Sequence, residues 1–567
     1  MPAIPSYGAT GTSYYLRDAL LVFGVALICY TWALGASPLA LTEGHRVVTA
    51  HQMVESGDWI VPTMYGRLYV KKPPLFYWVL ASVEYIGGFA DEWVWRLPSA
   101  FASALLAAAL CVLTARWFDR RAGVVAGFAI VGLIALWEQS RSAEIDAMNT
   151  LCSVLAALAV VELAYGRNLR TWMWTIGAGL MIGASLLLKG HAGLPVILGA
   201  MIGPPIALKT IAGLQRPAVW FAWGLGIVLF GAWLLALTSE LGARGIGPDM
   251  SGIAEAVETL HLTDQTRILR AGIVPLLLVL YSFPLSLAVP LCWKMPMAIA
   301  EHQKRLLKAL AATICASMLI FLVAGTTNPR YELLILPLLA PCAGGLAMAV
   351  EKEWLPSRMM IGLDRLWRAT GVLITIGHVA LAALVWPYAS SHVAVGLSCL
   401  CAVVLAVVWI RGWTVGRLFA HGMILIGMVV IFTVPFSEMQ NHRKFERSSY
   451  VQAREIRQYI GAGAQIATDR MLLVKPEFFY YLDVIVKPRS VEDMAGLEAG
   501  TWLMLNSAEW QIWNTRFPEK SNRHICFMLY KDAAHLVQLG PRLSTAQPDH
   551  PFSSSLISCV SAAQPRS

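Results

Sequence analysis

Long apolar stretches alternate with short polar segments along most of the 567-residue chain. A helix needs about 20 apolar residues to cross roughly 30 Å of hydrocarbon. Lipid offers no water to an unpaired backbone group, so such stretches form helices, and the alternating pattern of a membrane β-barrel is absent. The pattern predicts an all-α polytopic membrane protein with about 13 transmembrane helices, centred on 20–39, 97–115, 122–137, 147–164, 172–188, 193–211, 217–237, 271–293, 309–324, 333–350, 371–387, 393–410 and 418–436.

The segment 73–89 decides the topology. It starts with Pro73-Pro74 and is interrupted by Glu84, so we expect it to lie along the membrane interface. With a cytoplasmic N-terminus, most Lys and Arg residues of the short loops then face the cytoplasm, and the short outer loops hold only Arg141, Lys189 and Arg330. This bias follows the positive-inside rule. If the segment crossed the membrane, the bias would reverse for most of the chain.

Three segments lie outside in this topology: 40–96, 238–270 and everything after about residue 437. We therefore expect a transmembrane domain over residues 1–436 and a small periplasmic α/β domain over residues 437–567. In the latter, 450–460 is predicted as a helix, and 465–467, 471–474, 480–486 and 502–505 as strands. Its Ser-, Pro- and Gln-rich tail is typical of disorder.

Composition agrees with this assignment. Of all residues, 57% are hydrophobic and 14% are charged, whereas soluble domains carry nearer a quarter of charged residues. The formal net charge of +9 is explained by the loops, and no basic stripe with interleaved aromatic residues indicates nucleic acid as a partner. Membrane lipids are the expected surroundings.

Ten cysteines are present. Eight lie in or beside apolar helices, where cysteine acts as a small hydrophobic residue. Cys526 and Cys559 lie in the polar C-terminal segment and could form a disulfide in an oxidising compartment. No CxxC spacing indicates a zinc or redox site.

Charged residues gather at the outer ends of the predicted helices. Ionisable groups at membrane level are costly, so they face a cavity or a partner and indicate a functional site. The residues are Glu43, Lys71, Lys72, Arg96, Arg141, Glu144, Asp146, Lys189, Arg330 and Glu332.

Several stretches, in this order, together resemble the bacterial aminoarabinose transferases and protein O-mannosyltransferases, which have the GT-C membrane fold. The resemblance covers about residues 15–350 well and the rest by layout only. The stretches are Thr42-Glu43-Gly44-His45, Glu55 to Trp59, Lys72-Pro73-Pro74-Leu75, Arg96 to Ala100, Arg141 to Asp146, Lys189-Gly190 to Gly193, and Arg330-Tyr331 to Pro337.

The resemblance implies an inverting glycosyltransferase of the bacterial inner membrane that takes its sugar from a polyprenyl-phosphate donor. The sugar and the acceptor stay open: the acceptor is a lipid, a glycan or a protein, with lipid A, another glycan, a protein and a polyisoprenoid all as candidates. The family's catalytic acids correspond to Glu43 and Asp146. Thr42 stands where the family usually has Asp, and Lys71 replaces the acid before Lys-Pro-Pro. The resemblance also allows a divalent metal ion as cofactor.

These residue types suit the reaction. Negative charge builds on the departing lipid phosphate, and cations stabilise such charge in a dry site. We therefore expect Lys72, Arg141, Lys189, Arg330 and Tyr331 to bind the donor phosphate. A hydroxyl acceptor needs a carboxylate as base, whereas a phosphate acceptor is already a nucleophile.

Each residue also has a structural interpretation. Glu43 and Asp146 could stabilise helix N-termini, Lys72 could reach to lipid headgroups, and Lys189 and Arg330 could pair with nearby acids. His261 in the second outer loop could bind a metal, but a single His seldom does. Two other classes stay open: a transporter or flippase, and a non-catalytic relative that binds a lipid-linked sugar.

Overall fold

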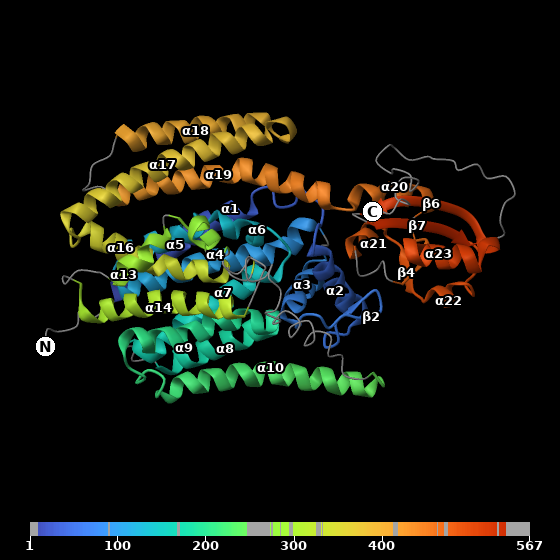
Figure 1. The fold of residues 1–567 in the computed structure, drawn as a ribbon, viewed down its shortest axis with the longest axis horizontal. Coiled ribbons are helices and arrows are strands. Elements are labelled where there is room, and N and C mark those ends of the chain that lie inside the picture. The colour runs from blue at the N-terminus through green and yellow to red at the C-terminus, as the bar shows by residue number, and fades with distance from the viewer. Residues whose placement is uncertain are drawn as a thin grey trace. The chain divides into compact units, whose positions relative to one another are not determined.

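The structure is a computed structural model (Figure 1). It describes residues 9–88, 91–166, 171–246, 273, 276–283, 285–293, 299–324, 330, 333–411, 418–461, 463–469, 475–529 and 532–539. The chain forms two compact units. The first consists of residues 1–34, 71–76 and 96–440, and the second of residues 35–70, 77–95 and 441–567. The second unit thus joins two parts of the predicted outer loop 40–96 with the C-terminal segment.

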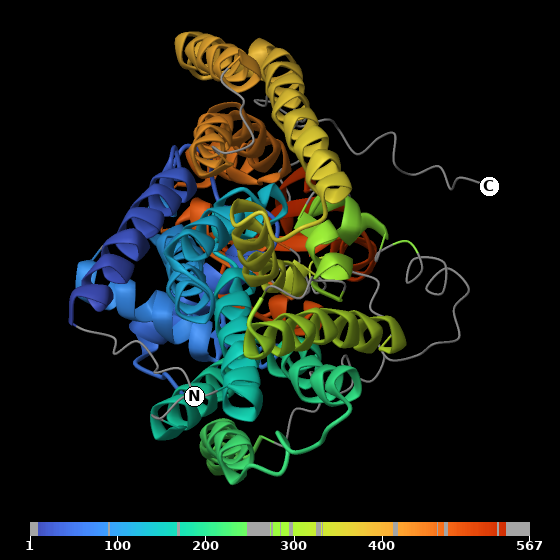
Figure 2. The same ribbon diagram turned by 90° about the vertical axis from the view of Figure 1, so that its left-hand side faces the viewer.

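Long helices build the first unit, and Figures 1 and 2 show them running alongside one another. Contacts are extensive between α14 and α9, α10 and α8, and α7 and α8. The helices are α1 (Ala9–Thr31), α4 (Glu92–Trp117), α5 (Arg120–Val131), α6 (Trp137–Ser140), α7 (Ile145–Tyr165), α8 (Thr171–Lys189), α9 (Leu194–Leu208), α10 (Pro217–Ala243), α13 (Ala288–Trp293), α14 (Glu301–Val323), α16 (Leu339–Glu351), α17 (Ser357–Val385), α18 (His392–Arg411) and α19 (Leu418–Arg447), with the 3-10 turns η1 (Ile134–Leu136), η2 (Gly190–Gly193), η3 (Leu285–Leu287), η4 (Leu333–Leu338) and η5 (Trp386–Tyr388). The first residues of α4, 92–95, and the last of α19, 441–447, belong to the second unit.

Within the described ranges, nine helices are long and apolar enough to cross a membrane, or ten if the bent pair 120–131 and 134–140 is one span. The chain is therefore a multi-pass membrane protein. The count of about 13 stays a prediction, because the runs 271–293 and 418–436 fall partly on residues or side chains outside the description. In addition, 171–208 forms one helical stretch of 38 residues.

The first helix lies earlier than predicted. The apolar run suggested 20–39, but α1 covers Ala9–Thr31 and the chain then turns at Ala33, which has φ 51°. The polar residues before Leu20 continue the helix, and Gly35, Ser37 and Pro38 do not favour one. Hydropathy locates the apolar window but not the helix ends, which depend on capping.

Small residues allow the helices of the first unit to approach closely. A Cβ atom built on Gly203 of α9 would lie 2.2 Å from the Ala312 carbonyl oxygen of α14. A Cβ on Gly123 of α5 would lie 2.4 Å from the Cys111 carbonyl oxygen of α4. Membrane helices use such positions because packing, rather than water exclusion, holds them together.

The second unit combines helices with a five-stranded sheet of order β4-β3-β5-β7-β6, in which β3 runs parallel to β4 and β5, and β7 runs antiparallel to β5 and β6. The elements before the sheet are α2 (Glu43–Ser56), β1 (Thr63–Met64), β2 (Arg67–Leu68) and α3 (Leu75–Gly87). The others are α20 (Tyr450–Ile460), β3 (Gln465–Thr468), α21 (Pro476–Leu482), β4 (Ile485–Pro488), α22 (Val491–Met494), β5 (Trp502–Asn506), α23 (Ser507–Arg516), the turn η8 (Pro518–Lys520), β6 (Ser521–Leu529) and β7 (Asp532–Leu539).

Side chains alternate between the two faces of this sheet, as strand geometry requires. On β5, Trp502 and Met504 pack with residues of α20 and α21, whereas Leu503 and Leu505 pack with residues of α22 and α23. The expected strand at 480–486 is partly wrong. Residues 476–482 form α21, because Pro476 suits the first helical turn and Phe478, Phe479 and Leu482 are buried along one side.

Helix α3 bears on the topology. It has 13 residues, which corresponds to about 20 Å of helix and falls short of the hydrocarbon thickness. This length agrees with the expectation that 73–89 does not cross the membrane.

Candidate active site

The first turn of α7 gathers two carboxylates and two cations of the first unit. Asp146 is 3% exposed and accepts a hydrogen bond from Lys189 Nζ. Glu144 precedes the helix, is 4% exposed, and has its Oε1 3.9 Å from Nη1 of Arg330. Unpaired backbone N–H groups give a helix N-terminus positive character that favours carboxylates. The structure therefore joins two predicted site residues, Asp146 and Lys189, and places Arg330 beside the same turn.

The chain around Lys189 explains this contact. Lys189 is the last residue of α8, where the negative helix end favours a cation, and Gly190 then turns the chain with φ 58°. A Cβ at Gly193 would collide with Ser185 Oγ, so glycine lets the chain after α8 pack closely against this hydroxyl. Ser185 also donates to Asn149 Oδ1 of α7 at 2.9 Å. These contacts hold the end of α8 against the start of α7.

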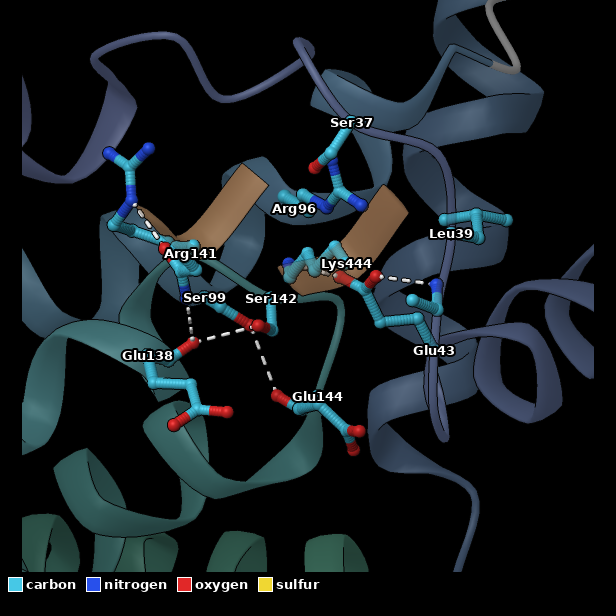
Figure 3. A network of polar contacts seen from close by, with 12 residues as sticks. Ser37, Leu39, Glu43, Arg96, Ser99, Glu138, Arg141, Ser142, Glu144 and Lys444 are labelled. Carbon is cyan, nitrogen blue, oxygen red and sulfur yellow. Dashed lines mark hydrogen bonds and ion pairs between the residues drawn. The ribbon is translucent and has the colours of Figure 1, made fainter. Parts of the chain in front are cut away.

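Hydroxyl groups hold the loop before α7, as Figure 3 shows. Ser99 of α4 donates from Oγ to the Glu144 carbonyl oxygen at 3.0 Å. Ser142 donates from Oγ to the Glu138 carbonyl oxygen at 2.7 Å. These bonds hold the backbone that carries Glu144 and Asp146.

Arg141 is a helix cap in the structure. Its side chain is buried, and the carbonyl groups at the end of α1 lack partners within their own helix. The guanidinium donates to four oxygens: Cys29 O at 3.1 Å, Tyr30 O at 3.2 Å, Trp32 O at 2.6 Å and Gln440 Oε1 at 2.8 Å. These bonds engage most of its five N–H groups. The predicted contact of Arg141 with a phosphate stays a prediction.

Glu43 lies in the second unit, at the first position of α2, and is 1% exposed. Its Oε2 accepts a hydrogen bond from the Ala40 backbone N–H at 3.0 Å, and its Oε1 accepts one from Lys444 Nζ, also at 3.0 Å. Figure 3 shows both bonds. Lys444 lies near the end of α19 and is itself buried. Sequence reasoning missed it, because a lysine in a polar segment gives no sign of burial.

A second buried ion pair lies close by in the same unit. Lys475 Nζ is 3.3 Å from Glu477 Oε1 and donates to the Arg447 carbonyl oxygen at 3.0 Å. Glu477 is fully buried, and its Oε2 has no hydrogen-bond donor among the described residues. Burial raises the pKa of Glu477 to about 7, against the lowering effect of the Lys475 charge. The sequence had suggested no chemistry in this segment.

The structure shows less about the remaining predicted residues. Lys72 is half-buried in the first unit, directly before Pro73-Pro74. Tyr331, His261 and Cys559, and the side chain of Cys526, lie outside the described residues. The Cys526–Cys559 disulfide and the role of Tyr331 stay predictions.

In the described part of the chain, no three His, Cys, Asp or Glu side chains are grouped to hold a metal ion, so the divalent metal has no candidate ligand set there. A cavity of about 490 Å³ in the first unit runs along α5 and α17 and is mainly apolar. Its charged lining residues, Arg121, Glu351 and Asp364, are not among the predicted site residues, and we assign no chemistry to it.

Sequence comparison relates part of the chain to known transferases. Residues 71–235 match the family model described as dolichyl-phosphate-mannose-protein mannosyltransferase. An undecaprenyl phosphate-alpha-4-amino-4-deoxy-L-arabinose arabinosyl transferase of Pseudomonas savastanoi is 26% identical over 177 residues, covering 31% of this chain and 33% of that protein. A second such transferase, from Pseudomonas fluorescens, is 29% identical over 234 residues, covering 39% and 40%. The matched segments span about a third of the length of these curated relatives.

Structural comparison covers nearly the whole chain. The crystal structure of ArnT from Cupriavidus metallidurans bound to undecaprenyl phosphate superposes with a TM-score of 0.69 at 16% sequence identity, covering 94% of this chain and 100% of that chain. Identity at this level establishes the fold and leaves function to the site. The chain therefore has the GT-C fold of this transferase, as the sequence resemblance implied, and part of it is similar in sequence to aminoarabinose transferases and to the protein mannosyltransferase family model.

Proposed function

We propose that the chain is an integral membrane glycosyltransferase that moves a sugar from a polyprenyl-phosphate donor to a lipid, glycan or protein acceptor, with inversion at the anomeric carbon. The observation that carries the proposal is the buried Asp146–Lys189 pair at the start of α7, with Arg330 beside the same turn. The sequence relatives are named as transferases that use undecaprenyl phosphate-linked aminoarabinose. These names favour transfer over transport.

The reaction breaks the bond between the anomeric carbon and the phosphate oxygen, and that oxygen keeps the electron pair. An acceptor oxygen forms the new bond to the carbon, and a hydroxyl acceptor gives its proton to a carboxylate. Lys189 has three N–H donors, so it can hold Asp146 and a phosphate oxygen together. Arg330 and Lys72 are proposed as further phosphate contacts, because cations stabilise the charge that develops on the leaving group.

Two carboxylates are proposed as catalytic groups. Asp146 is held by Lys189, and Glu43 by Lys444 and a backbone N–H. A side chain fixed in this way loses little freedom when it accepts a proton, which is what a positioned base requires. The acceptor class decides whether either group removes a proton or only orients the reactants.

Substitution of Asp146 tests the proposal. A strain that lacks the gene is complemented with wild type, Asp146→Asn, Glu43→Gln or Glu138→Gln, and its envelope glycolipids are compared by mass spectrometry. Glu138 is the matched control, because it lies just before the same helix and forms no ion pair among the described residues. We expect product to fall at least ~100-fold in the first two variants and to persist in the control.

The result is interpreted against protein amount in the membrane, measured by immunoblot. Wild-type product levels in both Asp146→Asn and Glu43→Gln would remove the catalytic assignment. A normal set of envelope glycolipids in the deletion strain itself would remove the transferase proposal and favour the transport or binding-only alternatives.

We propose further that the protein lies in the bacterial inner membrane with its N-terminus in the cytoplasm and residues 437–567 in the periplasm. The distribution of Lys and Arg over the loops supports this orientation. Cysteines introduced at the exposed positions Arg454 and Arg358 are treated in intact cells with a maleimide that cannot cross the inner membrane. Labelling is expected at position 454 and not at position 358, and the opposite pattern would reverse the orientation.

A further inference from the structure

The second unit contains four buried ionisable side chains. Removing a charge from water costs several kcal/mol, so buried charges are rare unless they are paired. Here two carboxylates and two ammonium groups, each at most 6% exposed, share one region next to the start of α2. They are Glu43, Lys444, Lys475 and Glu477.

The start of α2 and the start of α21 are in close contact. A Cβ built on Gly44 would lie 2.6 Å from Glu477 Oε2 and 2.9 Å from the Glu477 backbone nitrogen. Any larger residue at position 44 would push the two helices apart. The Glu477 carboxyl group therefore lies against the residue that follows Glu43, and the negative charge of Glu43 contributes to raising the pKa of Glu477.

Several ionisable groups of the described residues lie around Glu477. From its own segment it faces Lys475, and from α2 it faces Glu43, which is in turn paired with Lys444 of α19. Tyr65, from the turn between β1 and β2, donates from its hydroxyl to the Pro476 carbonyl oxygen at 2.8 Å. The rings of His51 of α2 and Tyr480 of α21 are in contact, and α20 carries the half-buried Glu455.

We propose that Glu477 is a positioning residue for Glu43: its carboxyl group, enclosed against the first turn of α2, sets the charge next to Glu43 and so its strength as a base. The proposal rests on the catalytic role proposed for Glu43. The C-terminal segment, in which the sequence showed no chemistry, then acts on the reaction through this contact.

The direction of the effect follows from the charges. Two neighbouring carboxyl groups do not ionise independently, and the second loses its proton at higher pH. Well below pH 7, Glu477 is mostly neutral, and Glu43 faces the positive charge of Lys444 with no second negative charge from Glu477. As Glu477 ionises, its negative charge makes Glu43 a stronger base. The rate of sugar transfer to a hydroxyl acceptor should therefore rise near pH 7. The rise is at most about tenfold if ionised Glu477 makes Glu43 more basic by one pKa unit.

The test compares pH profiles in isolated membranes that still contain their own donor and acceptor lipids. Formation of the glycolipid defined by the deletion strain is followed from pH 5 to pH 9 for wild type, Glu477→Gln, Glu477→Asp and the control Glu492→Gln. Glu492 lies in the same segment but is exposed and pairs with Arg516. We expect the rise near pH 7 in wild type, the control and Glu477→Asp, and a flat profile in Glu477→Gln.

Protection of the α2 amides from hydrogen exchange shows whether a substitution at Glu477 changes only the basicity of Glu43 or also unfolds α2. If Glu477→Gln keeps this protection and loses the rise, the proposal holds. If Glu477→Gln keeps the rise, or if the rise is absent from wild type, the proposal is overturned. A Glu43→Gln variant with full activity would instead overturn the proposed role of Glu43, whatever the profile of Glu477→Gln.

Discussion

The stability of the second unit should depend on pH through Glu477. Burial raises the pKa of its carboxyl group from 4.5 to about 7 in the folded protein. A group whose folded pKa is raised contributes stability that is fully present below the unfolded pKa and is lost as pH rises through the folded pKa. We therefore expect the unit to weaken between about pH 4.5 and pH 7 and then to level off.

The magnitude follows from the size of the shift. Each unit of pKa corresponds to about 1.4 kcal/mol, so wild type should lose roughly 3 kcal/mol across this interval. In Glu477→Gln the titrating group is gone, and the loss from this source should disappear. The comparison is made within each variant, between low and high pH, because the substitution also changes the surroundings of Lys475.

Hydrogen exchange of the α21 amides measures this free energy, after correction for the intrinsic effect of pH on exchange. The purified full chain in detergent is measured at pH 5 and pH 8 for wild type, Glu477→Gln and the exposed control Glu492→Gln. Wild type and control should lose protection at pH 8, and Glu477→Gln should not. Equal protection of wild type at both values would refute the reasoning, because Glu477 would then ionise as it does in water.

Three further outcomes are expected. Lys189→Met alone should destabilise the first unit by about 3–5 kcal/mol, because it leaves Asp146 charged and buried, and the double variant Lys189→Met with Asp146→Asn should lose less stability. Thermal unfolding of the single and double variants in detergent measures these losses, and losses that simply add would contradict the prediction. Gly203→Val should cost about 1–3 kcal/mol or more by overpacking α9 against α14, while Gly224→Val, which has nothing within 4 Å of its Cβ, should cost much less by the same assay. Arg141→Lys should lower stability by about 1–3 kcal/mol through the lost carbonyl contacts, and unchanged stability with weaker donor binding would show a substrate contact instead.

Sequence reasoning located most apolar helices of the first unit, since a run of apolar residues must be buried in lipid or protein wherever it lies. It also selected Asp146, Lys189 and Arg330, because charges at membrane level stand out from their neighbours. It could not show which of these side chains are in contact. The contact of Asp146 with Lys189 depends on how α7 and α8 pack, and this packing depends on Gly193 and Ser185.

The second unit was harder to predict. Its strands are short, and the segment 476–482 has the aromatic residues of a strand but forms α21. Lys444, Lys475 and Glu477 look like ordinary surface charges in a polar segment. Their burial comes from contacts with residues 35–70, hundreds of positions away in the chain.

Local pattern by itself determined that this protein is a helical membrane protein with charged groups at its helix ends, because hydropathy acts on each segment separately. Tertiary structure alone decided which charges are paired, which arginine caps a helix and which carboxyl group is buried. Those properties depend on distance and on access to water, and both are set by residues far apart in the sequence.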